Sequence, residues 1–242
     1  MKIAVAQTRP IRGDIRRNIE KHTALIDLAA SAGASMVIFS ELSLTGYEPE
    51  LAGKLATYQD DSRFEDIQKI SDAKTITIGA GMPTVSESGI RISMLIFQPN
   101  SPRQVYSKQH LHADEFPYFV AGDQPVFLTK GKQKVALAIC YELSIPGHSA
   151  YAVQQGATVY VASVAKTLTG VENAGQTLSN IANTCSIPVL MANCIGYCDT
   201  FESAGNSAIW NSNGVLIGQL KSTDEGILMI DTETQDLVEK LL

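Results

Sequence analysis

Short runs of apolar and β-branched residues recur along the whole chain, with polar segments between them. Runs of this length and composition, bounded by turn residues, are typical of buried β-strands. We therefore predict strands at Lys2–Gln7, Ser35–Ser40, Thr75–Met82, Ile92–Gln98, Lys134–Cys140, Thr158–Ser163, Pro188–Cys194, Asn206–Trp210, Val215–Leu220 and Gly226–Ile230.

Apolar residues at helical spacing fill several of the gaps between these strands. In the first gap Ile15, Ile19 and Ile26 recur on one face, Asp14 is a suitable N-cap, and Gly33 is a suitable stop. The pattern predicts helices over Asp14–Ala32, over Asp61–Ala73, from Cys140 toward Gln155, and over Asn173–Cys185.

The last part of the chain departs from this alternation of strands and helices. Turn residues in Trp210-Asn-Ser-Asn-Gly-Val separate two strand runs, as in a hairpin. We therefore expect a mixed sheet or a pair of sheets. No internal repeat, low-complexity segment or linker is evident, and 242 residues can bury a large core, so we expect one domain over residues 1–242.

Composition and charge narrow the classes of partner and location. The net charge is −6 and no dense Lys/Arg run occurs, so nothing favours binding to nucleic acid or to an anionic membrane. The apolar start Lys2–Gln7 is too short for a signal peptide, and no stretch reaches the roughly 20 apolar residues of a membrane span. We expect a cytoplasmic protein whose four cysteines are free thiols.

Three segments share one arrangement, in which a predicted strand ends in a polar residue just before a loop. Open α/β sheets bind ligands at the carboxyl ends of their strands, so side chains at such ends can converge although they are far apart in sequence. In the first segment Glu41 follows the apolar run Val37-Ile-Phe-Ser. This carboxylate is a candidate general base, and the alternative is an acid that caps the following loop.

The other two segments contain a lysine and a cysteine. Lys108, in Tyr-Ser-Lys-Gln-His-Leu, is a candidate source of positive charge for an oxyanion, and the alternative is a solvated surface lysine. Cys140 stands where a buried strand gives way to a predicted helix, as in a nucleophile elbow, and the alternative is a structural cysteine. Such a turn directs backbone N–H groups, here that of Tyr141, toward a developing oxyanion.

In this order the three segments resemble the nitrilase superfamily of carbon–nitrogen hydrolases. The similarity runs from Lys2–Gln7 through Phe-Ser-Glu-Leu, Tyr-Ser-Lys-Gln-His-Leu and Ile-Cys-Tyr-Glu-Leu to Ala-Gly-Asn-Ser-Ala-Ile-Trp. The resemblance implies that Glu41 is the general base, Lys108 the oxyanion stabiliser and Cys140 the nucleophile. It also implies that Glu115 positions Lys108 and the substrate.

The resemblance further implies a fold and an assembly. The fold would be a four-layer αββα sandwich, in which two mixed β-sheets face each other and helices lie outside. Members of the superfamily commonly associate, so the resemblance implies a homodimer or a larger homo-oligomer.

The chemistry of a thiol agrees with these roles. A thiol of pKa about 8.5 is mostly protonated at neutral pH and needs a base or a nearby cation before it attacks. Glu41 and Lys108 would meet both needs. We expect hydrolysis of a small amide through a thioester on Cys140, with release of ammonia or an amine and then of a carboxylic acid. This chemistry requires no metal and no organic cofactor.

Substrate recognition is the part of the resemblance that is least complete. Where many members continue past the cysteine with an aspartate and then an arginine, this chain has Tyr141, Glu142, Leu and Ser, so that position offers no arginine for a substrate carboxylate. Lys166 could supply that charge, or it could be a surface lysine. Tyr141 and Glu142 are expected beside the substrate, although Glu142 could equally serve the first turn of the following helix.

Other readings of the same residues stay open. A nitrilase or an N-carbamoyl hydrolase would use the same Glu–Lys–Cys site, and a catalytically silent binding protein would share the fold. His110 or His112 could pair with a thiol, as in Cys–His hydrolases. Cys194 and Cys198 lack the paired spacing of a zinc site. Gly79-Ala-Gly is better explained by a tight strand exit than by a phosphate-binding loop. A metal-dependent phosphodiesterase would need clustered Asp, His and Asn ligands.

Overall fold

The computed structural model describes residues 1–242 as two large mixed β-sheets and a separate small hairpin. The first sheet has the order β15-β14-β1-β2-β3-β4-β5, and the second has the order β13-β12-β9-β8-β7-β6. The strands of the first sheet are β1 (Lys2–Gln7), β2 (Met36–Ile38), β3 (Thr77–Ser86), β4 (Gly89–Phe97), β5 (Gln104–Ser107), β14 (Gly226–Asp231) and β15 (Leu237–Leu241). Those of the second are β6 (Phe127–Lys130), β7 (Gln133–Ile139), β8 (Val159–Val164), β9 (Val189–Asn193), β12 (Ala208–Trp210) and β13 (Leu216–Gln219), and the hairpin consists of β10 (Ile195–Cys198) and β11 (Phe201–Ala204).

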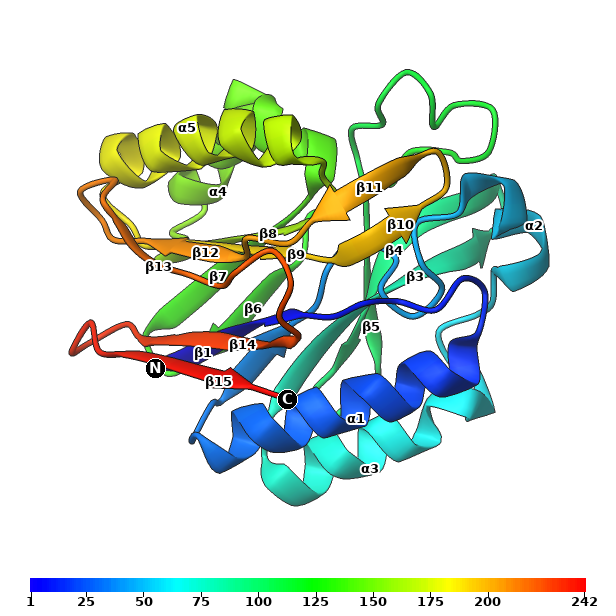
Figure 1. Cartoon of the computed structure of the whole chain (residues 1–242), viewed down its shortest axis with the longest axis horizontal. Coiled ribbons are helices and arrows are strands. Elements are labelled where there is room, and N and C mark those ends of the chain that lie inside the picture. The colour runs from blue at the N-terminus through cyan, green and yellow to red at the C-terminus, as the bar shows by residue number, and fades with distance from the viewer.

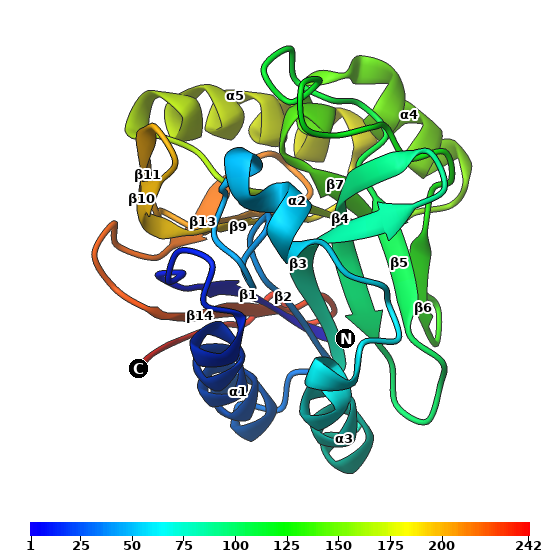
Figure 2. The same ribbon diagram turned by 90° about the vertical axis from the view of Figure 1, so that its right-hand side faces the viewer.

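The helices lie on the outer faces of the two sheets. In Figures 1 and 2, α1 and α3 cover the first sheet and α4 and α5 cover the second, so the chain forms the expected four-layer αββα sandwich. The α-helices are α1 (Ile15–Ser31), α2 (Ala52–Leu55), α3 (Glu65–Lys74), α4 (Pro146–Gln154) and α5 (Leu168–Cys185), with 3₁₀ turns at Pro49–Leu51, Ser62–Phe64 and Cys140–Ser144.

Three apolar clusters hold the four layers together. One joins the inner faces of the two sheets and includes Val5 and Ile38 from the first and Leu137 and Leu190 from the second. The other two lie between each sheet and its own helices. Strands that are covered on both faces read as continuous apolar runs, which is why the central strands are visible in the sequence.

The predicted helices exist, but three of them have different limits. The helix predicted over Asp61–Ala73 consists of a 3₁₀ turn, Ser62–Phe64, followed by α3 from Glu65. The helix predicted to begin at Asn173 begins at Leu168, because Thr167 caps it by accepting a hydrogen bond from the Gly170 N–H. The helix predicted to run on from Cys140 is interrupted: a 3₁₀ turn ends at Ser144, and Pro146 then starts α4. The hairpin predicted around Asn211 is confirmed by the antiparallel pairing of β12 with β13.

Five short strands were absent from the sequence prediction. They are β5, β6, β10, β11 and β15, which lie at sheet edges or in the isolated hairpin, and each of them carries at least one exposed residue. A partly exposed strand of four or five residues has too weak a pattern to stand out from a loop.

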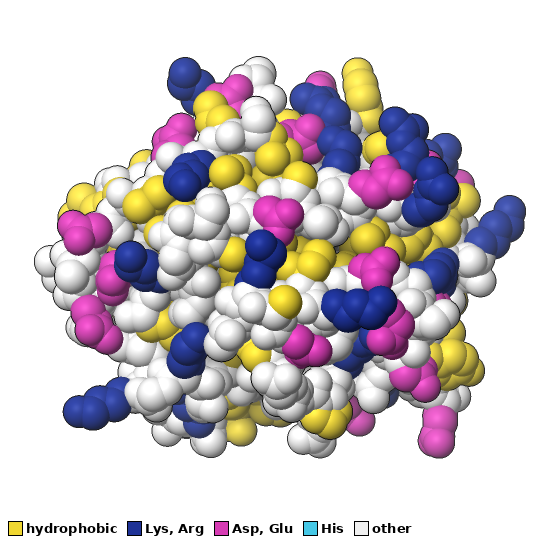
Figure 3. All heavy atoms as spheres, turned by 90° about the horizontal axis from the view of Figure 1, so that it is seen from below, with side chains coloured by type: hydrophobic (Ala, Val, Ile, Leu, Met, Phe, Trp, Pro, Cys, Tyr) yellow, Lys and Arg dark blue, Asp and Glu magenta, His cyan; other side chains and the backbone are white.

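The surface carries charges of both signs. On the face shown in Figure 3, acidic and basic side chains are interspersed and neither sign forms a continuous patch. No helix combines the length and the apolar character required to cross a membrane.

Candidate active site

The chain changes direction at Cys140, directly after β7. Cys140 has φ of 45°, in the left-handed region that residues other than glycine rarely adopt. This backbone bend ends the strand, begins the 3₁₀ turn Cys140–Ser144 and places the Cys140 side chain in the wall of a cavity. A strained turn that presents a nucleophile between a strand and a helix is the geometry of a nucleophile elbow.

Three buried charged side chains meet beside this turn. Lys108 Nζ lies 2.8 Å from Glu41 Oε1 and 2.6 Å from Glu115 Oε1, and both contacts are ion pairs. The side chains of Lys108 and Glu41 are fully inaccessible to solvent. Glu41 and Lys108 follow β2 and β5 closely, and these strands are parallel to one another through β3 and β4, so their carboxyl ends share one edge of the first sheet.

Burial and charge set the protonation of this cluster. Burial raises the pKa of Glu41 above its ordinary value, and the opposing influence of Lys108 is smaller. Burial alone would lower the pKa of Lys108, but the negative charges around it, Glu41 first, hold it above its ordinary value. Lys108 is therefore a permanent cation, and Glu41 is a stronger base than a solvated carboxylate.

The pKa of the Cys140 thiol is raised to about 11, first by burial and then by the charge of Glu41. The thiol is thus protonated at neutral pH in the resting state. Glu41 Oε2 is buried and receives no hydrogen bond from the Lys108 ammonium, which binds Oε1. That oxygen is the acceptor on this carboxylate that is available for the thiol proton.

The loop that carries Glu41 is held against the middle of β3. A Cβ on Gly81 would lie 2.2 Å from the Leu42 backbone nitrogen, so this strand position admits only glycine. The Gly81 N–H donates to Ser43 Oγ, which also contacts the buried His22 ring. The glycine pair at 79 and 81 lies inside β3, so the expected tight strand exit is wrong; the glycines allow two backbones to approach.

Glu115 receives hydrogen bonds from the neighbouring loops. The Tyr47 hydroxyl donates to Oε1 over 3.0 Å, and the His112 N–H donates to Oε2 over 2.8 Å. Burial raises the pKa of Tyr47, which keeps its proton on the donor side of this bond. Glu115 is thus fixed by two donors besides Lys108, which agrees with a positioning role.

Glu142 lies elsewhere than the sequence analysis expected. It is fully buried and does not line the cavity beside Cys140. Its carboxylate accepts hydrogen bonds from the Ile139 N–H, the Gln109 N–H and the Tyr106 hydroxyl, at 2.6, 2.6 and 2.7 Å. Glu142 therefore joins the end of β7 to the segment that follows Lys108, and it holds the nucleophile turn rather than the substrate.

A cavity of about 230 Å³ opens beside the thiol. It contains the other two expected binding residues, Tyr141 and Lys166, and it also contains residues to which the sequence analysis gave no role. The lining residues are Tyr47, His112, Asp114, Glu115, Cys140, Tyr141, Ala165, Lys166, Thr167, Gly170 and Phe201. Tyr47 could have been found from its place six residues after Glu41. Phe201 lies in the β10–β11 hairpin, which no hydrophobic pattern in the sequence indicated.

The rival candidates are placed as follows. His112 lines the cavity, but its ring contacts Asp114 at 2.6 Å, and His110 packs against His148. Cys194 and Cys198 are buried free thiols with their sulfurs 3.6 Å apart. No group of three or more His, Cys, Asp or Glu side chains is arranged to hold a metal ion.

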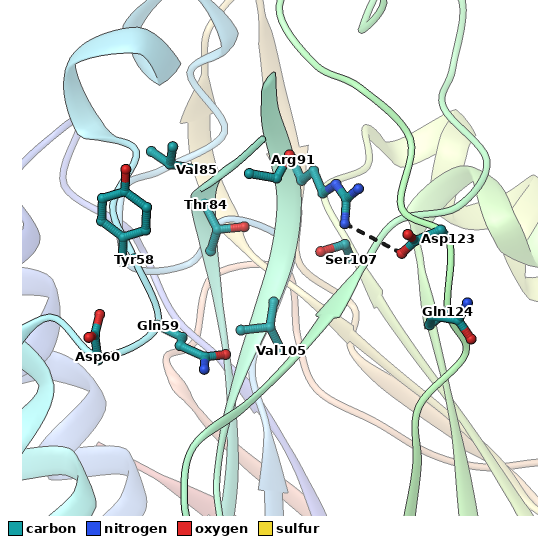
Figure 4. Close-up of a pocket in the computed structure, with 11 residues that line it drawn as sticks. Tyr58, Gln59, Asp60, Thr84, Val85, Arg91, Val105, Ser107, Asp123 and Gln124 are labelled. Carbon is teal, nitrogen blue, oxygen red and sulfur yellow. Dashed lines mark hydrogen bonds and ion pairs between the residues drawn. The ribbon is translucent and has the colours of Figure 1, made fainter. Parts of the chain in front are cut away.

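A second cleft, of about 420 Å³, is lined by residues of β3, β4 and β5 and by the loop residues 58–60 and 123–124 (Figure 4). Arg91 and Asp123 form an ion pair of 3.4 Å across it. It contains the Ser107 hydroxyl but no thiol, and the Ser107 side chain is bonded to Ser93. The cleft shares no lining residue with the Cys140 cavity, so the two are separate.

Comparison with known families decides which class of protein carries this site. The family model described as carbon-nitrogen hydrolase matches residues 2–239. The chain belongs to the carbon–nitrogen hydrolase family. This match, across nearly the whole chain, confirms the resemblance to the nitrilase superfamily.

Individual relatives of this carbon–nitrogen hydrolase are distant. It is 25% identical to the "Hydrolase in agr operon" of Staphylococcus aureus, over 99% of this chain and 94% of the relative. It is 23% identical to the glutamine-dependent NAD(+) synthetase of Thermotoga maritima, over 98% of this chain but only 42% of that protein. An (R)-stereoselective amidase of a Pseudomonas species is 26% identical over 66% of the chain and 59% of the relative.

Solved structures agree on the fold. The NitN amidase of Nesterenkonia sp. AN1 superimposes with a TM-score of 0.85 over 96% of this carbon–nitrogen hydrolase and 92% of the amidase, at 24% identity. A cysteine-to-alanine variant of that amidase in complex with butyramide gives a TM-score of 0.86 at 23% identity, over 97% of this chain and 92% of the variant. The four-layer arrangement is therefore that of nitrilase-superfamily amidases.

Proposed function

We propose that this chain hydrolyses small amides through a thioester on Cys140. The observation that carries the proposal is the buried cluster in which Lys108 binds both Glu41 and Glu115 beside the thiol. The Nesterenkonia amidase, which shares the fold, binds butyramide, and in another structure its active-site cysteine carries the acetamide moiety of fluoroacetamide. A small amide is therefore the substrate class that fits this cavity best.

The first half of the reaction forms the thioester. The thiol sulfur attacks the amide carbon while its proton passes to Glu41 Oε2, and a C–S bond forms. The oxyanion is stabilised by the Lys108 ammonium and by the Tyr141 N–H. The C–N bond then breaks, and the proton held by Glu41 passes to the departing nitrogen, which leaves as ammonia or an amine.

The second half releases the acid. Glu41 removes a proton from a water molecule, whose oxygen attacks the thioester carbon and forms a second oxyanion in the same position. The C–S bond breaks, the sulfur regains the proton from Glu41, and the carboxylic acid leaves. The atoms balance as one amide and one water consumed for one acid and one amine, without a metal or cofactor in any step.

The test combines intact-protein mass spectrometry with ammonia release from a panel of small amides, nitriles and N-carbamoyl compounds. We expect an acyl adduct and ammonia release that disappear in Cys140→Ala and persist in Cys185→Ala, a control at a free cysteine of α5. Turnover of nitriles alone, or of N-carbamoyl compounds alone, would replace the amide assignment with that activity. Turnover that persists in Cys140→Ala would overturn the mechanism.

A further inference from the structure

Two thiols that take no part in the proposed reaction lie behind one wall of the Cys140 cavity. Cys194 and Cys198 are both buried, and their sulfurs are 3.6 Å apart. They do not line the cavity themselves. They pack in one cluster with three residues that do, namely Tyr47, Ala165 and Phe201. A change at this thiol pair therefore acts on the wall that the substrate would touch.

The backbone between the two cysteines is bent, which brings their side chains together. Four residues of extended strand would separate the two Cα atoms by about 13 Å, too far for the sulfurs to meet. Gly196, between them, has φ of 92°, a value that glycine adopts readily. This bend returns Cys198 toward Cys194. The approach of the two sulfurs is thus a consequence of the backbone conformation.

The two thiols are chemically unequal. The hydrogen bond between them is the largest influence on both pKa values: it lowers the pKa of Cys194 and raises that of Cys198. Cys198 is therefore the donor of the pair. The thiolate is the form of cysteine that reacts with peroxides. Cys140, whose pKa is raised to about 11, chiefly by burial, is the poorer target at neutral pH.

The position of the pair in the fold provides access for a small oxidant. β10 and β11 form a two-stranded sheet apart from both large sheets, and an isolated hairpin of two strands has little stability of its own. Its turn residues Asp199 and Thr200 are exposed and directly follow Cys198. Local opening at this end admits hydrogen peroxide, a molecule little larger than water.

We propose that hydrogen peroxide converts Cys194 and Cys198 into a disulfide, and that this bond lowers the activity of the enzyme until it is reduced. The loss of activity rests on the proposed amide hydrolysis at Cys140, whereas the formation of the bond does not. The pair is thus a reversible oxidation site next to the catalytic residues.

The reaction has two steps. The Cys194 sulfur, as its thiolate, attacks one peroxide oxygen and becomes a sulfenic acid; the O–O bond breaks, and the leaving hydroxide takes up the proton that the sulfur had lost. The Cys198 sulfur then attacks the Cys194 sulfur, an S–S bond replaces the S–O bond, and the second hydroxide leaves with the Cys198 proton. One peroxide is reduced to two waters while two thiols are oxidised to one disulfide.

Formation of the bond moves the cavity wall. The sulfurs must close from 3.6 Å to about 2.05 Å, so the chain at Cys198 shifts relative to Cys194 by about 1.5 Å unless the side chains alone absorb the change. Tyr47 packs on the pair, and its hydroxyl donates to Glu115, which binds Lys108. A displacement of about 1 Å at a catalytic group costs up to roughly 100-fold in rate.

The bond itself is measured in Cys140→Ala/Cys185→Ala, in which Cys194 and Cys198 are the two remaining cysteines. After treatment with peroxide we expect the intact mass to fall by two hydrogen atoms and both thiols to resist alkylation in denaturant, and dithiothreitol should reverse both changes. Adding Cys198→Ala should abolish the loss of mass. Two thiols that stay free, or that gain oxygen without losing hydrogen, would overturn the proposal.

The effect on activity is measured in Cys185→Ala, which keeps Cys140 and the thiol pair. We expect peroxide to lower kcat/KM for butyramide roughly 10- to 100-fold and dithiothreitol to restore it. Adding Cys194→Ala, or Cys194→Ser as a closer match in size, should slow this inactivation at least roughly tenfold, because the protonated Cys140 thiol remains as the target. Each variant is compared with its own untreated activity, and circular dichroism checks that it is folded.

The outcomes separate this inference from the proposed function. A disulfide that forms without a change in kcat/KM would overturn the effect on activity, and equal inactivation rates with and without Cys194 would assign the oxidation to Cys140. Either result leaves amide hydrolysis standing. Failure of the folded, reduced protein to release ammonia from any amide would overturn the proposed function, while the mass measurement would still decide whether the disulfide forms.

Discussion

Glu41 illustrates how a single carboxylate can serve two partners. Oε1 is bound to the Lys108 ammonium, which keeps the carboxylate oriented, and Oε2 is buried and carries no hydrogen bond. The nearby thiol has its pKa raised to about 11, chiefly by burial, and therefore enters the reaction with its proton. The loss of activity at low pH is thus expected from protonation of the base, Glu41, rather than of the nucleophile, Cys140.

This assignment predicts a pH dependence. Burial raises the pKa of Glu41, and only the ionised form accepts the thiol proton, so activity is present above that raised pKa and is lost as the pH falls through it. Glu41→Gln should lower kcat roughly 10²- to 10⁴-fold and abolish this acidic limb. The pH profile of kcat/KM checks both points. The control Glu50→Gln alters an exposed acid and should retain the limb, whereas an unchanged limb in Glu41→Gln would assign it to another group.

The elements around the site converge on the nucleophile turn through Glu142. Its carboxylate receives two backbone N–H groups, one at the end of β7 and one just after Lys108, and the Tyr106 hydroxyl of β5. Tyr106 also contacts His148 of α4, which is bonded to Tyr160 of β8. These hydrogen bonds connect the nucleophile turn to strands of both sheets close to the reacting groups.

We expect Glu142→Gln to weaken this link. The amide NH₂ of glutamine would face a backbone N–H, so one buried donor loses its acceptor, at a cost of about 1–3 kcal/mol in the free energy of unfolding. Because Cys140 and Lys108 lose their shared support, kcat should fall more than KM rises. Denaturant unfolding and steady-state kinetics measure the two effects, with the exposed Glu87→Gln as the control. Equal stability and equal kcat would refute the link.

A pair of glycine substitutions tests the packing of the Glu41 loop on β3. In Gly81→Ala the new Cβ would overlap the loop backbone at 2.2 Å, so the loop must move and Glu41 with it. We expect at least a tenfold loss of kcat, comparable with the effect of misplacing a catalytic group by about 1 Å. Gly147→Ala in α4 meets no atom within 4 Å, and it should keep full activity and gain up to about 1 kcal/mol of stability. Comparable activity of the two variants would contradict the packing argument.

At the scale of the whole molecule, the site belongs to neither sheet alone. Glu41 and Lys108 follow strands of the first sheet, whereas Cys140 and Lys166 follow strands of the second. The apolar cluster between the inner faces therefore sets the distance between the base and the nucleophile. If the two sheets separate, we therefore expect the active site to be lost at the same time.

Leu190→Ala tests this coupling because Leu190 is fully buried in β9 within the inter-sheet cluster. The cavity should lower the free energy of unfolding by about 2–5 kcal/mol. Circular dichroism and residual activity should then be lost at the same, lower denaturant concentration. Leu216→Ala, at a half-exposed position of β13, is the control. Loss of activity well before the loss of secondary structure would show that the site can come apart while the sheets remain joined.

The sequence by itself determined the elements whose residues are buried on both faces and the residues that end them. Central strands such as β1, β7 and β8 were visible as apolar runs, and Asp14 caps α1 as predicted. Glu41, Lys108 and Cys140 could be selected because each is a reactive group placed where an apolar strand stops. These properties are local, and hydrophobic periodicity and residue chemistry report them directly.

The tertiary structure alone decided which of the selected side chains meet and what each one faces. Glu142 and Lys166 are both polar residues near strand ends, yet one is enclosed by three donors and the other faces the cavity without a partner. Tyr47 and Phe201 reach the cavity from segments more than a hundred residues apart. The orientation of a side chain depends on how distant strands pack, and that packing energy is shared among many residues that no local pattern contains.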